Sequence, residues 1–266
     1  MHRRRQTKPV TLPTTVHPVS EVARAWNVVP SRVAPTWELR PWPNDPTAML
    51  LVFTDHTSLP SGIDLENAVA RARTAGIRTL RTSALFPGAA GIALQHGFTP
   101  IDTLHLLRLR LDDAAISRID ELAAASRHTT RPLRTWHHPR AAEVDQDAFG
   151  PLWGNDEASV ADIRVATPHH RARMVRDGRH MAGFAISGWG GNSGYVQRVA
   201  VRRDHRRRGV ARALVVDALA WMRGRPVTAA YVNTGLDNAP ALALYEDLGF
   251  ERMDERLVIA ARDIAA

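Results

Sequence analysis

A strand, a basic loop and an apolar helix follow one another between residues 195 and 222, and this succession constrains the fold more than any other feature. Tyr195–Val201 is predicted as a strand, Arg202–Arg208 is rich in arginine, and Val210–Met222 repeats apolar residues at helical spacing. Gly209 opens the helix. The first N–H groups of a helix have no intrahelical acceptor, and a glycine lets a ligand approach the backbone closely. The order therefore predicts an anion-binding loop at a helix N-terminus.

Two other interpretations of the basic loop stay open. An arginine-rich loop is also typical of a solvated turn, and the net charge of +8 is compatible with a nucleic-acid-binding module that uses Arg202–Arg208. Such a module needs basic residues over a whole face, whereas these lie in one loop between a strand and a helix. We therefore expect no nucleic-acid partner and keep that module as an alternative.

The composition excludes several kinds of site. None of the 266 residues is a cysteine, so disulfides, thiolate nucleophiles and cysteine-ligated metals are excluded. The pairs His137-His138 and His169-His170 lack the i, i+4 spacing of a helical zinc pair, so we expect no metal site. No run reaches the ~18–20 apolar residues that a membrane span needs. We expect a cytoplasmic protein without membrane contact.

The chain divides into four segments. Residues 1–19 hold charges and three prolines and are expected to form a flexible arm. Residues 37–112 and 132–266 both alternate strands with helices, and residues 113–131 form a linking helix. The second segment has the order β-β-β-α-β-α-β, which predicts an α/β (α+β layered) fold with a mixed central sheet and crossover helices.

Local signals define the elements of the second segment. Asp177-Gly178 lies between two alternating runs and predicts a hairpin with a type I′ turn. Asn238 is the expected N-cap of a later helix, which has Pro240 in its first turn and ends at Gly249.

The first segment repeats the element order of the second in a weaker form. Its predicted elements are a strand at 48–53, a helix with Asp64 as N-cap, a strand at 79–83, a short helix at 91–98 and a strand at 103–111. Before the Asp64 helix no arginine and glycine motif appears, and Pro60 removes a backbone donor. We expect a degenerate copy that keeps the fold without the anion site, and we expect residues 130–266 to retain that site alone.

Two motifs carry a family resemblance. Arg206-x-x-Gly209-x-Ala211, between a strand and a helix, resembles the signature of the GNAT superfamily of acyl-CoA-dependent N-acyltransferases. One strand later, Asn238-x-x-Ala241-x-x-Leu244-Tyr245-x-x-x-Gly249-Phe250 resembles the second common block of that superfamily. The resemblance covers about Pro132–Ile264 and implies a GNAT-like fold for this part of the chain.

The resemblance also implies how acetyl-CoA would bind. Backbone N–H groups of the basic loop and the helix start would hold the pyrophosphate, the strand before them would pair with the pantetheine arm, and neighbouring strands would splay apart for the thioester. The implied donor-binding residues are Val199, Ala200, Val201, Arg206, Arg207, Arg208, Gly209, Val210, Ala211, Arg212, Asn238 and Tyr245.

Tyr245 is the implied catalytic residue. A phenol near the sulfur can donate a proton or a hydrogen bond to the departing thiolate. Leu242 and Leu248 flank it at i−3 and i+3, so plain packing in the core is the alternative.

A general base is harder to assign. Neither 194–198 nor 229–233, where some members of the superfamily place a glutamate, contains a carboxylate. The remaining candidates are Asp156, Glu157, His169, His170 and His205. Solvent can also accept the proton.

These observations predict an N-acetyltransferase that moves an acetyl group from acetyl-CoA to a primary amine of a small molecule or a protein. A non-catalytic acyl-CoA-binding sensor is the alternative that the missing carboxylate suggests.

Overall fold

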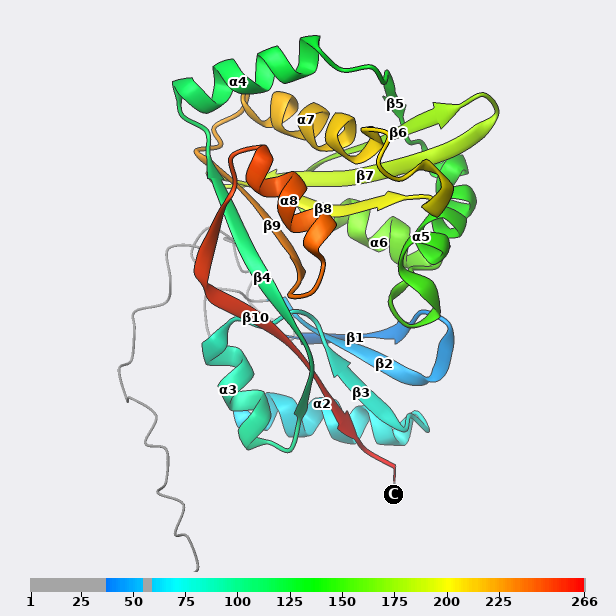
Figure 1. Cartoon of the computed structure of the whole chain (residues 1–266). Coiled ribbons are helices and arrows are strands. Elements are labelled where there is room, and N and C mark those ends of the chain that lie inside the picture. The colour runs from blue at the N-terminus through cyan, green and yellow to red at the C-terminus, as the bar shows by residue number, and fades with distance from the viewer. Residues whose placement is uncertain (1–36, 55–58, 266) are drawn as a thin grey trace, which may run out of the picture.

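All ten strands of the described chain join into one mixed sheet. The computed structural model describes residues 37–54 and 59–265, so the expected arm of residues 1–19 lies outside the described part. The strand order is β1-β2-β3-β10-β4-β9-β8-β7-β6-β5 (Figure 1). Helices pack on both faces of the sheet, which confirms the predicted layered α/β fold with a mixed central sheet.

The strands range in length from three residues in β5, at one edge of the sheet, to thirteen in β10, near its middle. They are β1 (Trp37–Trp42), β2 (Asp45–Phe53), β3 (Thr79–Thr82), β4 (Thr99–Arg110), β5 (Thr130–Pro132), β6 (His169–Asp177), β7 (His180–Gly190), β8 (Ser193–Val201), β9 (Ala229–Gly235) and β10 (Glu251–Asp263). The strands that the sequence predicted are present, but β1 and β5 were not anticipated. Pro41 and the charged residues of β1 hide its alternation, and β5 begins inside the segment 113–131 that was expected to be helical throughout.

The helices connect these strands. They are α2 (Gly62–Thr74), α3 (Pro87–Gln95), α4 (Asp113–Ala124), α5 (His138–Trp153), α6 (Glu157–Val165), α7 (Val210–Met222) and α8 (Ala239–Asp247). Two single 3₁₀ turns precede α5 and α7, at Thr135–His137 and Arg203–His205. No described helix combines the length and the apolar character of a membrane span.

The two halves of the chain exchange their last strands. β2 and β3 pair in parallel, as do β8 and β9. β10, which ends the second half, pairs with β3 and β4 of the first half. β4, which ends the first half, lies between β10 and β9 of the second half. The internal repeat is therefore a repeat of topology, and each half completes the sheet of the other.

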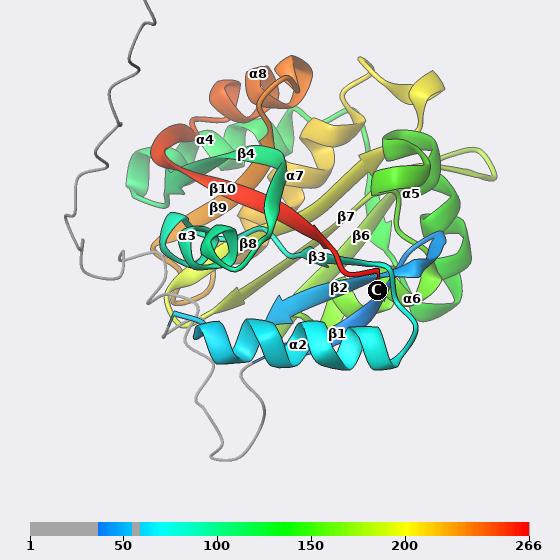
Figure 2. The ribbon, with the colours of Figure 1, turned by 90° about the horizontal axis from the view of Figure 1, so that it is seen from below.

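Figure 2 views the exchange from below: β10 crosses the middle of the picture with β4 beside it, and α2 and α3 of the first half lie in front. Leu65 and Ala93 of these helices pack with Leu80 of β3 and Ala260 of β10 in one core cluster. A segment of the second half therefore belongs to the core of the first.

Two local predictions need correction. Ser61, not Asp64, is the N-cap of α2: the Ser61 hydroxyl accepts from the Asp64 N–H, while the Asp64 carboxylate accepts from the Ser61 N–H at 2.9 Å. The hairpin at Asp177-Gly178 is confirmed: Asp177 pairs with His180, and Gly178 and Arg179 are the two turn residues. Of these two, only Gly178 has a positive φ, of 56°. The turn is therefore not of type I′, which requires positive φ twice; positive φ at its first residue alone is typical of type II′.

Helices cover the second half of the sheet on both faces. α7 and α8 pack against Val196 and Val232, and α4 lies on the outer side of α7, where Ile119 joins the same core. On the opposite face, α5 and α6 pack against Phe184 and Ala200. β8 thus runs between two helical layers, and the loop that follows it leads directly into α7.

Candidate functional site

β8 and β9 separate along their length. They pair only at Ser193–Tyr195 with Ala229–Tyr231, although β8 continues to Val201 and β9 to Gly235. On its other side β8 stays paired with β7 as far as Val201, and β9 with β4 as far as Gly235. The backbone edge of 196–201 therefore faces the space between the splayed strands. This confirms the divergence that the resemblance implied.

A β-bulge lies at the point of separation. Ser187 pairs with Val196 and Ile186 with Arg198, so Gln197 is the extra residue of β8. A bulge bends its strand and increases the local twist, which turns β8 away from β9. The Gln197 Oε1 atom is buried without a hydrogen-bond partner in the described chain.

The loop before α7 has the backbone geometry of an anion site. Gly209, the N-cap of α7, has φ +84° and supplies no side-chain cap, while Arg207 has φ +62°. Positive φ values alternating with negative ones turn successive N–H groups toward one concavity, a nest for anions. The first intrahelical bond of α7 joins the Ala213 N–H to the Gly209 carbonyl, so the N–H groups before Ala213 have no intrahelical acceptor. The α7 dipole adds positive potential there.

Backbone conformation, not lack of space, requires glycine at position 209. A Cβ atom there would meet nothing closer than the His128 ring, at 3.8 Å, which is ordinary contact. The φ of +84° is strained for any residue with a Cβ, most of all a β-branched one.

The equivalent helix start in the first half is built differently. α2 begins at a capping box, in which Ser61 and Asp64 satisfy each other's backbone N–H groups. A carboxylate and a hydroxyl thus occupy the position where α7 offers free donors. This contrast supports the prediction that the first half lacks an anion site.

Part of the arginine cluster anchors the loop to α5. The Arg206 guanidinium donates to the Ala148 carbonyl at 2.9 Å. Arg203 donates from its backbone N–H to the Asp147 carboxylate and from Nε to the Asp147 carbonyl at 2.8 Å. These side chains hold the loop in place, whereas Arg207 and Arg208 are exposed. Since a guanidinium has five donors, Arg206 keeps others for a ligand.

The remaining implied donor-binding residues line the same region. The side chains of Val199 and Val201 pack with Val210 on the α7 face, while Ala200 packs on the α5 face. Ala211 is half-buried in the first turn of α7. Arg212, beside it, forms a 2.5 Å ion pair with Asp247 at the end of α8. This pair ties the starting turn of α7 to the second motif.

Asn238 caps α8, as predicted. Its Oδ1 atom accepts from the Ala241 N–H at 3.4 Å, and its Nδ2 donates to the Thr234 hydroxyl at 3.0 Å. The second contact fixes the end of β9 on the open side of the splay. Both polar atoms of the Asn238 side chain are therefore used in local hydrogen bonds. The backbone of Asn238 and the exposed surface of its side chain remain for contact with a ligand.

Tyr245 is buried, with 6% of its surface exposed. Its ring packs edge-on against Phe250, with ring centroids 5.7 Å apart, in the same core cluster as Leu242 and Leu248. Burial raises the pKa of Tyr245 to about 12. The phenol therefore stays protonated at neutral pH. The packing that the sequence offered as an alternative is present, and it does not preclude donation from the hydroxyl.

The candidate bases have structural roles of their own. Asp156 is the N-cap of α6 and accepts from the Ser159 N–H at 2.8 Å. His205 lies between Asp204 at 2.6 Å and Asp177 at 3.3 Å.

Of the other candidates, His169 stacks on Trp189 with centroids 3.9 Å apart, and burial lowers the pKa of His170. Glu157 is exposed at the start of α6. Within the described chain, no three His, Asp or Glu side chains gather as they would around a metal ion.

A buried ion pair that the sequence did not reveal holds β8 to α5. Asp145 of α5 is completely buried and accepts from Arg198 at 2.8 and 2.6 Å, and from the Asn155 N–H at 2.6 Å. Arg198 also donates to the Trp153 carbonyl at 2.8 Å and lies 3.7 Å from the centre of the Phe149 ring. The residues are far apart in sequence, and neither stands in a recognisable motif, so only the fold brings them together.

Arg198 also lines a pocket of about 230 Å³ between the two halves. The β1–β2 hairpin forms one wall and the link between α5 and α6 the other, joined by hydrogen bonds from Asn44 to the Gly154 and Pro151 carbonyls. Trp42 packs edge-on against Trp153, with centroids 5.7 Å apart. The polar lining residues are Arg40, Thr82, Ser83, Asn155, Ser159, Asp162 and Arg198. Residues of the first half therefore line the space beside β8 on the face of the sheet that α5 covers.

Comparisons with known proteins agree with this geometry. The sequence model described as the acetyltransferase (GNAT) family matches residues 131–250. The chain is 33% identical over 123 residues to the N-alpha-acetyltransferase RimI of Mycobacterium tuberculosis, covering 44% of this chain and 74% of that protein. It is 29% identical over 197 residues to the mycothiol acetyltransferase of Arthrobacter sp. (strain FB24), covering 62% of this chain. The match spans 54% of that relative, about half its length.

Among solved structures, a tandem GNAT protein from the clavulanic acid biosynthesis pathway superposes with a TM-score of 0.56 at 19% identity. The superposition covers 83% of this chain and 76% of that chain, so the likeness of fold extends over both halves. With the splayed strands, the loop before α7 and these matches, the chain belongs to the acetyltransferase (GNAT) family.

Proposed function

We propose that this protein transfers an acetyl group from acetyl-CoA to a primary amine of a small molecule or a protein. One observation carries the proposal: the donor-rich loop at the start of α7 continues directly from the strand whose edge opens at the splay. The anion site and the extended backbone edge lie next to each other along the chain. Together they suit a ligand that has a pyrophosphate at one end and an amide-bearing arm at the other.

The chain's own groups fit such a donor. Backbone N–H groups from Arg207 to Arg212 would hold the pyrophosphate together with the Arg206 guanidinium, and the open edge at Val199–Val201 would pair with the pantetheine arm. Asn238 and Tyr245 of the second motif would lie along that arm. When bound, acetyl-CoA supplies an acetyl group activated as a thioester. Position and orientation of the two substrates then account for much of the rate acceleration.

Tyr245 is the proposed proton donor to the departing sulfur. Its high pKa keeps the hydroxyl protonated at neutral pH, as a donor requires. Its packing against Phe250 fixes the ring and leaves little rotational freedom to the phenol.

The pocket between the halves is the proposed entrance for the amine. It adjoins β8 through Arg198, on the face opposite α7, and its two tryptophans offer apolar surface beside polar groups. Neither the splayed part of β8 nor that of β9 carries a carboxylate. We therefore propose that the amine reacts in its neutral form and that its proton passes to solvent.

The division of labour between the segments is part of the proposal. Residues 132–266 would hold the donor, residues 37–112 would wall the acceptor side as a copy without a donor loop, and residues 113–131 would link them. We also propose a cytoplasmic location, where acetyl-CoA is available.

The test is a screen of amines for release of free CoA thiol from acetyl-CoA by the full-length protein. The panel holds small primary amines and peptides with free N-termini, and Gly209→Val serves as the matched control. We expect at least one amine to release CoA with the unaltered protein and none with the variant. Binding of acetyl-CoA without turnover on any amine would favour the sensor. Affinity for nucleic acid that falls steeply with salt would favour the nucleic-acid alternative.

A further inference from the structure

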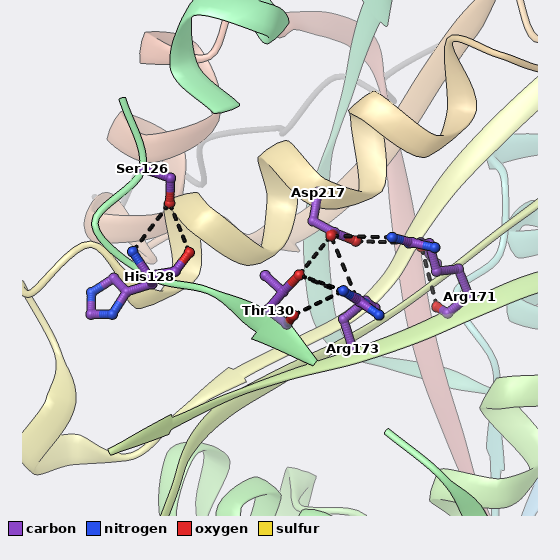
Figure 3. Close-up of polar contacts among 7 residues, drawn as sticks. Ser126, His128, Thr130, Arg171, Arg173 and Asp217 are labelled. Carbon is purple, nitrogen blue, oxygen red and sulfur yellow. Dashed lines mark hydrogen bonds and ion pairs between the residues drawn. The ribbon is translucent and has the colours of Figure 1, made fainter. Parts of the chain in front are cut away.

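The short connector between α4 and β5 touches the donor loop. It carries Ser126 and His128, whose backbone N–H donates to the Ser126 hydroxyl at 3.3 Å while that hydroxyl donates to the His128 carbonyl at 3.1 Å (Figure 3). This local turn orients the His128 ring toward the loop before α7. The His128 Nε2 atom lies 2.7 Å from the Arg208 carbonyl oxygen.

The chemistry of this contact fixes its direction. A carbonyl oxygen can only accept, so Nε2 carries the hydrogen and donates it. A planar peptide unit points its N–H opposite to its carbonyl. Holding the Arg208 carbonyl against His128 therefore aims the Gly209 N–H away from His128, into the concavity formed by the loop.

At the other end of the connector, the first residue of β5 is anchored on α7, the helix that follows this loop. The Thr130 hydroxyl donates to Asp217 in the middle of α7 at 2.6 Å, and Arg171 donates to Asp217 at 2.7 and 3.2 Å (Figure 3). Arg173 joins the cluster through Thr130. Burial alone would raise the pKa of Asp217, but these hydrogen bonds and charges lower it, so the carboxylate stays ionised.

The connector thus meets α7 at Asp217 through Thr130 and meets the loop before α7 through His128. A segment held at two points along one helix keeps a fixed distance from the start of that helix. The His128 contact is therefore a fixed feature of the frame around the loop, in contrast to the exposed side chains of Arg207 and Arg208.

We propose that His128 is a positioning residue for the donor site: it sets the Arg208–Gly209 peptide so that the Gly209 N–H is aimed at the pyrophosphate. The inference rests on the proposed function, because it assumes that the loop binds the pyrophosphate of acetyl-CoA. His128 itself touches the loop and not the reacting atoms.

The test compares three variants of the full-length protein by calorimetric titration with CoA. His128→Leu removes the donor, His128→Gln retains an N–H that can reach a carbonyl, and His180→Leu changes an exposed histidine at the start of β7. We expect His128→Leu to weaken CoA binding about 3- to 10-fold, the usual effect of one lost hydrogen bond. Both His128→Gln and His180→Leu should bind within about twofold of the unaltered protein.

The outcomes separate the inference from the function on which it rests. Equal CoA affinity in His128→Leu and the unaltered protein would overturn the role of His128 while leaving the donor site in place. Equally weak binding by His128→Gln and His128→Leu would also overturn it, because the loss would then not follow the donor. Absence of CoA binding by the unaltered protein would refute the proposed function, and the inference with it. Melting temperatures measured without ligand identify any variant that fails to fold. If His128→Leu is such a variant, the CoA affinity of His128→Gln relative to the unaltered protein decides.

Discussion

Breaking the buried pair between Arg198 and Asp145 is the sharpest test of how β8 is held. Asp145 is completely buried, while Arg198 is 20% exposed, so removing either partner leaves the other charge largely out of water. Loss of one partner of a buried pair costs about 3–5 kcal/mol. The partial exposure of Arg198 places Asp145→Ala near the lower end, about 3 kcal/mol. For a chain of this size that corresponds to a fall in melting temperature of about 6–12 °C.

A double-mutant cycle isolates the pair from the packing around it. We expect Asp145→Ala and Arg198→Ala each to destabilise strongly in urea unfolding, and the double variant to lose much less than their sum, with a coupling of about 2–3 kcal/mol. Glu246 and Arg252 supply a matched control, because they form a 2.6 Å ion pair in which both side chains are 45% exposed. Their coupling should stay below about 1 kcal/mol. Additive effects at Arg198 and Asp145 would refute the account of the pair.

Four further predictions concern the site and the exchanged strands. Gly209→Val should abolish measurable CoA binding in calorimetry while the circular dichroism spectrum is retained, because φ of +84° is incompatible with a β-branched residue; binding at the original affinity would remove the loop from the site. Tyr245→Phe should lower kcat ~10²–10⁴-fold on the amine found by the screen with little change in CoA affinity, and unchanged turnover would leave Tyr245 only its packing role. The same variant should lose less stability than the unaltered protein as pH rises above about 10. The folded state holds the phenolic proton up to a pKa of about 12, so folding stability falls where only the unfolded chain ionises. A protein of residues 130–266 alone should lack a cooperative urea transition, since β4 is missing from between β9 and β10; a cooperative transition would show that the second half folds by itself.

Local signals in the sequence were sufficient for the elements around the donor loop. Gly209 with its flanking small residues predicted the start of α7, and Asn238 with Pro240 predicted the start of α8. These signals are local because capping and positive φ are decided by neighbouring residues. The same reasoning failed at Asp64, where Ser61, three residues earlier, is an equally good cap.

Features that depend on distant residues could not be read from the sequence. The exchange of β4 and β10 between the halves follows from pairing over about 150 residues, and a strand pattern does not identify its partner. For this reason residues 130–266 looked self-sufficient, whereas the structure shows that β9 and β10 pair with β4. Arg198 and Asp145, like His128 and Arg208, meet only in the fold.

Calorimetric titration of the full-length protein with CoA counts the donor sites of the chain. We expect one donor site in each chain, at the loop before α7, and none at the capping box that starts α2. The expected result is saturable binding with one CoA per chain, and no heat of binding in Gly209→Val. Two CoA molecules per chain would contradict the assignment of the first half as a copy without a donor site, and no binding at all would contradict the donor site itself.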